Sequence, residues 1–200
     1  PVGGYAITAS GTVANAILIK GVTSTITANG SLVAGTFTDA IFKIIGGDYI
    51  TIDGFTMLEN PANTTTTAAS NNMTELGVAL FYSSTTNGCQ NITIKNNTID
   101  LNRTYLNTWG IYSNSNHSAT APLSAVPATS VSGNNSGLTI IANTITDVNN
   151  GIVVIGPSTA NNENDGLVIG GSLANANSIT NYGTASGFTG FANVSGAIHG

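Results

Sequence analysis

The fold is decided by one stretch, Asn91-Ile92-Thr93-Ile94-Lys95-Asn96-Asn97-Thr98-Ile99-Asp100. Its apolar and polar residues alternate with a period of two, so Ile92 and Ile94 face one side of a strand and Thr93 faces the other. Two Asn residues then interrupt the alternation, because Asn tolerates the unusual dihedral angles of a tight bend. Ile99 points inward again. The stretch therefore predicts a short strand, a bend and a second short strand.

Three other segments repeat this pattern: residues 49–57, residues 137–146, and an interrupted copy at 166–170 that resumes at 177–179. A second signature, a glycine followed by an apolar strand, occurs at 77–80, 110–113 and 150–154. A unit of about three short strands cannot bury its apolar face alone and must stack on its neighbours. The sequence therefore predicts an all-β fold, a parallel β-solenoid with polar loop insertions.

The repeats can be aligned on one inward isoleucine in each copy: Ile52, Ile94, Ile140 and Ile169. The unequal spacing is absorbed by polar tracts, which we expect to be loops near residues 60–74, 114–136 and 157–165. We expect residues 1–200 to form a single β-helix segment, a fragment of a longer solenoid that continues into further coils.

Asparagines recur at the bend of the repeats, at Asn97, Asn143 and Asn177. A buried amide at a bend needs hydrogen-bond partners, and a side-chain amide can donate to the carbonyl of the same residue type one coil along. The sequence therefore predicts an internal asparagine ladder. The alternative is that these residues are only turn formers.

The composition agrees with many short strands and few helices. Thr, Asn, Gly and Ser account for 97 of the 200 residues, whereas charged residues make up 6%. Turn formers and β-branched residues therefore dominate over the strong helix formers. The net charge of −5 leaves no basic surface for nucleic acid, and no apolar run is long enough to span a membrane. The lone Cys89 excludes an internal disulfide framework, and we expect it to be a small buried or turn residue.

The sequence pattern of residues 48–55, 91–99 and 149–154 resembles that of right-handed parallel β-helix repeats. It is most similar to long secreted surface proteins of Bacteroidota, which are often substrates of type IX secretion. The resemblance covers roughly residues 40 to 180. It implies an extracellular or cell-surface location in a bacterium. It implies little about activity, since this architecture carries lyases, glycosidases and adhesive stalks alike.

A catalytic site on this scaffold would need converging carboxylates, or calcium ligands with a basic residue nearby. The carboxylates of this chain scatter over the repeats, and the sequence indicates no cofactor and no metal site. The best catalytic candidates are Asp100 and Asp147, which follow equivalent strands, with Arg103 within reach. The alternative is that both aspartates are ordinary turn residues.

Binding candidates are the threonines at outward positions of the two strands in each repeat. They are Thr51, Thr93 and Thr139 on the first strand, and Thr56, Thr98 and Thr144 on the second. Stacked coils would align them into flat rows with about 4.8 Å between neighbours, which suits glycan or ice, although Thr is also an ordinary exposed strand residue. The bulky Val168 interrupts the first row. Tyr82, Tyr105, Trp109 and Tyr112 cluster around the second repeat, where we expect them to pack in the core rather than stack on sugars.

These observations favour a non-enzymatic structural or adhesive segment, with surface glycans or neighbouring chains as partners. One alternative is a carbohydrate-active β-helix, a polysaccharide lyase or glycosidase that uses Asp100, Asp147 and Arg103. The other is glycan or ice binding along the threonine rows.

Overall fold

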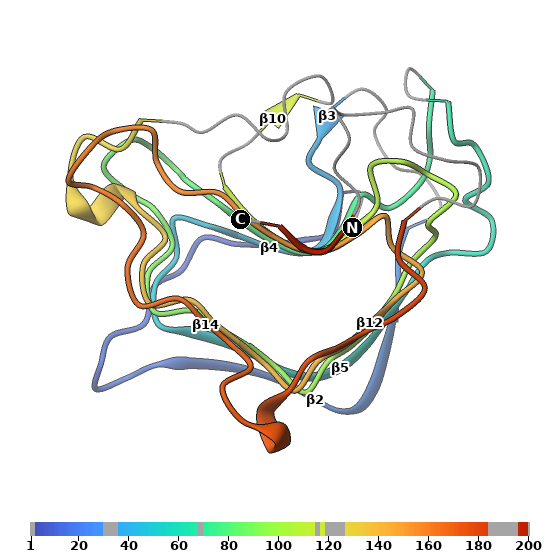
Figure 1. Ribbon diagram of the computed structural model, residues 1–200, viewed down its shortest axis with the longest axis horizontal. Helices are drawn as coiled ribbons and strands as arrows, with labels where there is room; N and C mark the ends of the chain where they lie inside the picture. The colour runs from blue at the N-terminus through green and yellow to red at the C-terminus, as the bar shows by residue number, and fades with distance from the viewer. Residues whose placement is uncertain are drawn as a thin grey trace.

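The chain forms an all-β structure that is built almost entirely from parallel strands. The computed structural model describes residues 3–29, 36–67, 70–114, 117–118, 127–183 and 196–199. Two large sheets face each other, and we call them the upper and lower sheet from their positions in Figure 1. The upper sheet contains, in spatial order, β1 (Tyr5–Ile7), β4 (Ala40–Ile45), β6 (Leu76–Phe81), β9 (Trp109–Ser113), β13 (Asn150–Val154) and β16 (Gly196–His199).

The lower sheet is bent and has two halves. Its two long strands, β2 (Ile17–Thr27) and β5 (Ile50–Leu58), pair on both sides of a register shift between Lys20 and Ser24. One half continues with β7 (Thr93–Lys95), β11 (Thr139–Ile141) and β14 (Val168–Ile169), and the other with β8 (Thr98–Asp100), β12 (Thr144–Thr146) and β15 (Ser178–Ile179). The sequence predicted a break at Gly54 in the first copy. Instead β5 stays continuous, because it remains paired with β2 on both sides of the bend.

The other elements are short. Strands β3 (Thr36–Phe37) and β10 (His117–Ser118) form an antiparallel pair above the upper sheet (Figure 1). Two 3-10 turns occupy Val131–Gly133 and Leu173–Asn175, and no other helix occurs in the described residues. Part of the predicted loops at 60–74 and 114–136 lies outside the described residues, while the described part of 60–74 and all of 157–165 contain no strand.

The strands group into five repeats: β1–β2, β4–β5, β6–β7–β8, β9–β11–β12 and β13–β14–β15. Each repeat adds its strands to the upper and lower sheets in the same order, and β16 follows β13 in the upper sheet. The register pairs Ile52 with Ile94, Ile94 with Ile140, and Ile140 with Ile169. The alignment of the copies that the sequence predicted is therefore confirmed.

The main hydrophobic core fills the space between the two sheets. Isoleucines of the lower sheet, such as Ile52, Ile94 and Ile99, are fully buried there against Val78 and Ile111 of the upper sheet. Only the inward face of each lower strand contributes, which explains its apolar and polar alternation.

A second core covers the outer face of the upper sheet. It contains Phe37 from β3, and Ala79, Trp109, Tyr112 and Val153 from the upper strands. The rings of Phe37 and Trp109 lie 4.5 Å apart between centroids. Both faces of β6, β9 and β13 are buried, so apolar residues occupy most positions on both sides of these strands. The predicted core placement of Tyr82, Tyr105, Trp109 and Tyr112 is confirmed, since all four are buried.

A column of glycines explains the second sequence signature. Gly77 and Gly110 stack on neighbouring strands, and a Cβ atom on Gly110 would lie 2.5 Å from Ile145 Cγ2 and 2.6 Å from the carbonyl oxygen of Gly151. A Cβ atom on Gly77 would meet Ile99 Cγ2 at 2.6 Å. The glycines therefore make room for the isoleucines of the lower sheet.

The chain turns into the lower sheet through a left-handed residue in successive repeats. Tyr49, Asn91, Gly137 and Gly166 have φ angles of 52°, 57°, 72° and 68°. The backbone N–H of each of the first three donates to the carbonyl oxygen of the residue just before the next one. The same corner is thus built four times, with glycine or Asn in three of the four cases.

Candidate functional site

The outer face of the lower sheet carries two rows of hydroxyl side chains. In the first row Thr51 pairs with Thr93 and Thr93 with Thr139. In the second row Thr56 pairs with Thr98 and Thr98 with Thr144. Paired residues on adjacent strands lie about 4.8 Å apart. The structure therefore brings all six predicted threonines into register.

The two rows differ at their ends. Leu18 precedes the first row and Val168 follows it, so hydrophobic side chains bound its three hydroxyls. The second row extends through Thr25 at one end and Ser178 at the other, which gives it a hydroxyl in every repeat. The sequence analysis did not predict Thr25 as part of this row, because β2 does not share the sequence pattern of the other copies. We call these five residues the hydroxyl row.

A second column of outward residues runs beside the hydroxyl row. It contains Thr27, Leu58, Asp100 and Thr146, paired in that order. Asp100 therefore lies among hydroxyl and apolar groups on this face, and it is the one charged residue of these four.

The asparagine ladder lies directly behind this face. Asn97 Nδ2 donates to Asn143 Oδ1 at 3.1 Å, and Asn143 Nδ2 donates to Asn177 Oδ1 at 3.0 Å. The backbone N–H groups of Phe55, Asn97 and Asn143 donate to the side-chain oxygens of Asn97, Asn143 and Asn177, respectively. The predicted ladder is confirmed. Because Asn97 and Asn143 are buried, these bonds fix the bend and therefore the spacing of the hydroxyl row.

The three catalytic candidates lie close together at the edge of this face. Arg103 Nε is 3.9 Å from Asp147 Oδ1, and Asn181 Nδ2 donates to the same oxygen. Asp147 is not equivalent to Asp100, because the register pairs Asp100 with Thr146 and places Asp147 one residue further, in a left-handed turn. Burial and the charge of Asp147 both raise the pKa of Asp100. Two neighbouring carboxyl groups with a cation beside them are a chemically usable set.

A second carboxyl pair lies in the interior and was missed from the sequence. Glu75 is fully buried and Asp39 is 2% exposed. Glu75 Oε2 accepts a hydrogen bond from the backbone N–H of Asp39 at 3.0 Å. Burial, with a further contribution from the charge of Asp39, raises the pKa of Glu75 to about 8. The one signal for this pair was that each acid directly precedes an apolar strand, β4 or β6.

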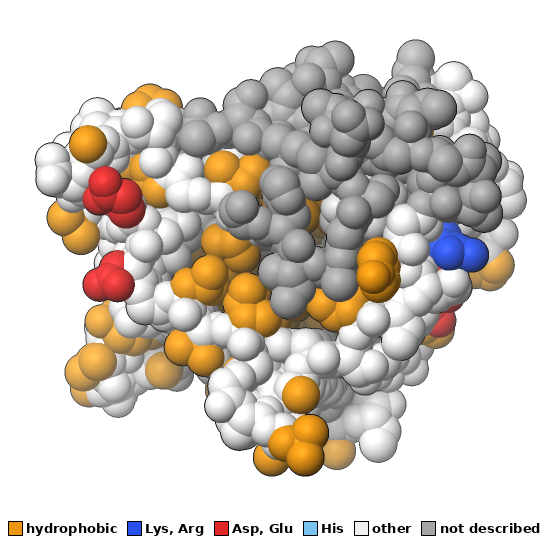
Figure 2. Space-filling model, in the orientation of Figure 1, with side chains coloured by type: hydrophobic (Ala, Val, Ile, Leu, Met, Phe, Trp, Pro, Cys, Tyr) orange, Lys and Arg blue, Asp and Glu red, His pale blue; other side chains and the backbone are white. Residues whose placement is uncertain are grey.

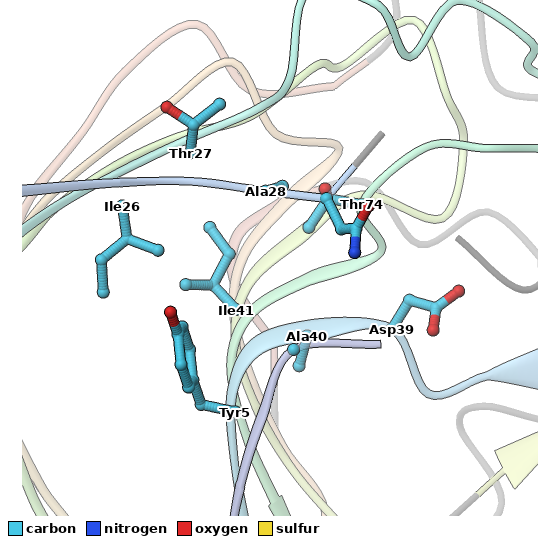
Figure 3. Close-up of a pocket in the computed structure, with 10 residues that line it drawn as sticks. Tyr5, Ile26, Thr27, Ala28, Asp39, Ala40, Ile41 and Thr74 are labelled. Carbon is cyan, nitrogen blue, oxygen red and sulfur yellow. The ribbon is translucent and has the colours of Figure 1, made fainter. Parts of the chain in front are cut away.

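A pocket of about 240 Å³ opens near Asp39, between β1, the end of β2 and the start of β4 (Figure 3). Tyr5, Ile26 and Ile41 point toward one another across it, whereas the carboxyl group of Asp39 is turned away from them. Thr74 and Asn29 complete the polar side. The buried Glu75 does not line this pocket, so the interior carboxyl pair and the pocket do not form one catalytic site.

Few charged groups are visible on the face in Figure 2. Among the residues that the structure describes, no three His, Cys, Asp or Glu side chains group as metal ligands would. The described helices are all too short to cross a membrane. Cys89 is buried, as expected, and its thiol faces the carbonyl oxygens of Phe81 and Ile44.

No protein-family model, curated protein or solved structure matches the chain.

Proposed function

We propose that the chain is a segment of a right-handed parallel β-helix in which the five repeats are successive coils. The parallel register supports this, because equivalent residues pair from repeat to repeat in both sheets. The asparagine ladder supports it too, since side-chain ladders recur where identical positions stack.

Pairs of engineered cysteines test the coil register. Thr51→Cys with Thr93→Cys places two thiols on paired residues of neighbouring strands, and we expect them to form a disulfide on mild oxidation. The matched control, Thr51→Cys with Thr139→Cys, separates the thiols by two strands and should stay reduced. Cys89 is buried and stays out of the exchange. Crosslinking of the control but not of the neighbours would contradict the register.

We further propose that this segment is a non-enzymatic structural or adhesive element on the outside of a bacterial cell. The observation that carries the proposal is the hydroxyl row, a regular uncharged surface that runs through every repeat. The repeats resemble those of surface proteins that are often exported by type IX secretion, and this resemblance is the basis for proposing that route here.

Binding to surface polysaccharides tests the adhesive role. The purified chain should bind a glycan array or an insoluble polysaccharide without releasing reducing ends or unsaturated products. Thr93→Tyr and Thr98→Tyr place bulky rings on the two rows and should weaken binding. Leu173→Tyr is a suitable control because Leu173 is 96% exposed and lies outside the rows. Equal binding by all three variants would exclude the rows as the binding surface.

The proximity of Asp100, Asp147 and Arg103 favours a second function, cleavage of a polysaccharide. Incubation with acidic and neutral polysaccharides should then give products, and Asp100→Asn or Asp147→Asn should abolish them. Asp165→Asn is the control, since Asp165 lies in a separate loop. If both Asp100→Asn and Asp147→Asn still form products, these residues have no catalytic role.

The spacing of the hydroxyl row also favours binding of ice. An ordered row of hydroxyl and methyl groups with about 4.8 Å between neighbours presents a lattice rather than a cleft. The unmodified chain should then shape growing ice crystals, and Thr98→Tyr should remove this effect. Absence of ice shaping by the unmodified chain would eliminate this function.

A further inference from the structure

An amine and a carboxyl group approach each other at the start of β4, and the functions proposed above use neither of them. Lys43 lies on β4, and its Nζ donates to the carbonyl oxygen of Thr38 at 2.9 Å. Asp39, the next residue after Thr38, is 2% exposed. A Cβ atom on Gly3 would lie 3.1 Å from Asp39 Oδ1 and 3.4 Å from Lys43 Nζ. The two groups therefore reach the same point beside the start of β1.

A second acid, Glu75, lies against Asp39 in the interior. Glu75 is fully buried, and its Oε2 accepts a hydrogen bond from the backbone N–H of Asp39 at 3.0 Å. Its other oxygen, Oε1, has no hydrogen-bond partner in the described part of the chain. Burial and the charge of Asp39 raise the pKa of Glu75 to about 8, so this carboxyl group is protonated at neutral pH. A buried, protonated carboxyl group can donate a hydrogen bond and act as a general acid.

A simple ion pair does not explain why Lys43 is placed here. Among the residues that the structure describes, Lys43 forms no ion pair, whereas Lys95 pairs with Asp53 on the outer face of the lower sheet. The Lys43 amine instead bonds a backbone carbonyl group one residue away from the Asp39 carboxyl group. A turn of the lysine side chain from Thr38 to Asp39 brings the amine to that carboxyl group.

We propose that Lys43 and Asp39 form an intramolecular amide bond, with Glu75 as the general acid. The Lys43 ammonium group first gives a proton to the Asp39 carboxylate, which leaves a neutral amine and a carboxyl group. Lys43 Nζ then attacks Asp39 Cγ, and the N–C bond forms. Glu75 donates its proton to the departing hydroxyl group and takes a proton from the nitrogen, so the C–OH bond breaks and one water molecule leaves. In sum, an ammonium and a carboxylate become an amide and water.

Proximity and burial both favour this reaction. An amine and a carboxyl group react slowly as separate molecules, but holding them in one site supplies a large effective concentration. The amide product is also neutral. It removes the desolvation cost of keeping a cation and a carboxylate together in a site with little solvent contact. The nearly complete burial of Asp39 therefore favours the linked form.

The amide closes a small ring over residues 39–43 at the entry to the upper sheet. The carbonyl oxygen of Asp39 accepts the backbone N–H groups of Glu75 and Leu76, so Asp39 joins the start of β4 to the start of β6. The ring fixes this junction. The inference does not depend on the hydroxyl row, and failure of glycan or ice binding leaves it intact.

Mass spectrometry of the 200-residue chain tests the proposal. We expect the intact mass to be lower than the sequence mass by one water molecule. Trypsin applied to the denatured product should cleave after Lys20 but not after Lys43, because an amidated lysine is not a substrate. Residues 21–95 should then appear as one peptide that lacks one water molecule. A chain with the full sequence mass and normal cleavage after Lys43 would overturn the proposal.

Substitutions separate the roles of the two reacting groups from that of the acid. Lys43→Arg keeps a cation but removes the nucleophilic amine, so this variant should retain the full mass. Glu75→Gln keeps an acceptor for the Asp39 N–H but has no acidic proton, so the linked peptide should form about 100-fold more slowly after expression. Lys95→Arg, which changes the ion pair with Asp53, is the matched control and should still lose one water molecule.

Circular dichroism checks that each variant is folded. If Glu75→Gln does not fold, the mass of the unmodified chain and that of Lys43→Arg still decide whether the amide exists. Loss of water from Lys43→Arg would place the reaction elsewhere and overturn the proposal. An unchanged rate in folded Glu75→Gln would overturn the role of Glu75.

Discussion

The upper and lower sheets are built from the same repeats, with the same parallel register, yet they differ in what lies on their outer faces. Phe37, Trp109 and Tyr112 cover the upper sheet with a second core, while the lower sheet leaves its hydroxyl row in solvent contact. The upper sheet therefore contributes to stability from both faces. The lower sheet contributes from one face and leaves the hydroxyl row on the other face in contact with solvent. Residues on the outer face of the upper sheet therefore stabilise the fold, whereas residues on the outer face of the lower sheet are accessible to solvent.

Truncation of a large side chain on each outer face should give the widest contrast. Trp109→Ala removes a side chain that is 1% exposed and packs against Phe37, and we expect it to lower the free energy of unfolding by about 3 to 5 kcal/mol. Thr98→Ala on the lower sheet should change it by less than about 0.5 kcal/mol. Urea unfolding measures both. Similar losses for the two variants would mean that the outer face of the lower sheet is also a packed interface.

The glycine column should be nearly as sensitive. Gly110→Ala forces a methyl group to within 2.5 Å of Ile145 Cγ2 and 2.6 Å of a backbone oxygen, so we expect a loss of about 1 to 3 kcal/mol. Gly156→Ala is the matched control, because its nearest atom, Asn164 Nδ2, is 3.9 Å away. Thermal unfolding distinguishes them. A stable Gly110→Ala protein would show that the two sheets can separate locally at little cost.

The asparagine ladder should make a contribution of similar size that is confined to the bend of the lower sheet. Asn143→Ala removes the acceptor for the Asn97 N–H and the donor to Ile94 O, both in the interior. Leaving such groups unsatisfied costs about 1 to 3 kcal/mol. Hydrogen exchange should become faster in the neighbouring repeats, whereas Thr144→Ala should leave it unchanged. Equal hydrogen-exchange rates in the Asn143→Ala and Thr144→Ala variants would show that the ladder does not fix the bend.

The interior carboxyl pair should make the upper sheet sensitive to pH. The pKa of Glu75 is raised from 4.5 to about 8, so the folded chain holds a proton that the unfolded chain loses above pH 4.5. Stability should therefore fall between pH 4.5 and about 8, by about 1 kcal/mol per pH unit, and level off above that range. Glu75→Gln should flatten this dependence when melting temperature is measured against pH. An unchanged slope would assign the dependence to other groups.

Much of the lower sheet could be predicted from residues alone. The period-two alternation around Ile94 and Ile140 fixes which side chains face inward, and repetition of the pattern fixes which residues pair. The threonine register and the ladder from Asn97 to Asn177 follow from the same two facts. The positions of Asp100 and Asp147 were predicted less well, because a one-residue shift at the corner is set by the left-handed turn at Asp147.

The sequence by itself determined the inward and outward faces, the alignment of the repeats and the rows that the alignment produces, because these depend on local periodicity. Only the tertiary structure decided that Phe37 covers the upper sheet, that Asp39 and Glu75 share a buried site, and that Thr25 completes the hydroxyl row. These features arise where segments far apart in the chain meet. No local pattern specifies such a meeting, because it depends on the order in which the strands add to each sheet.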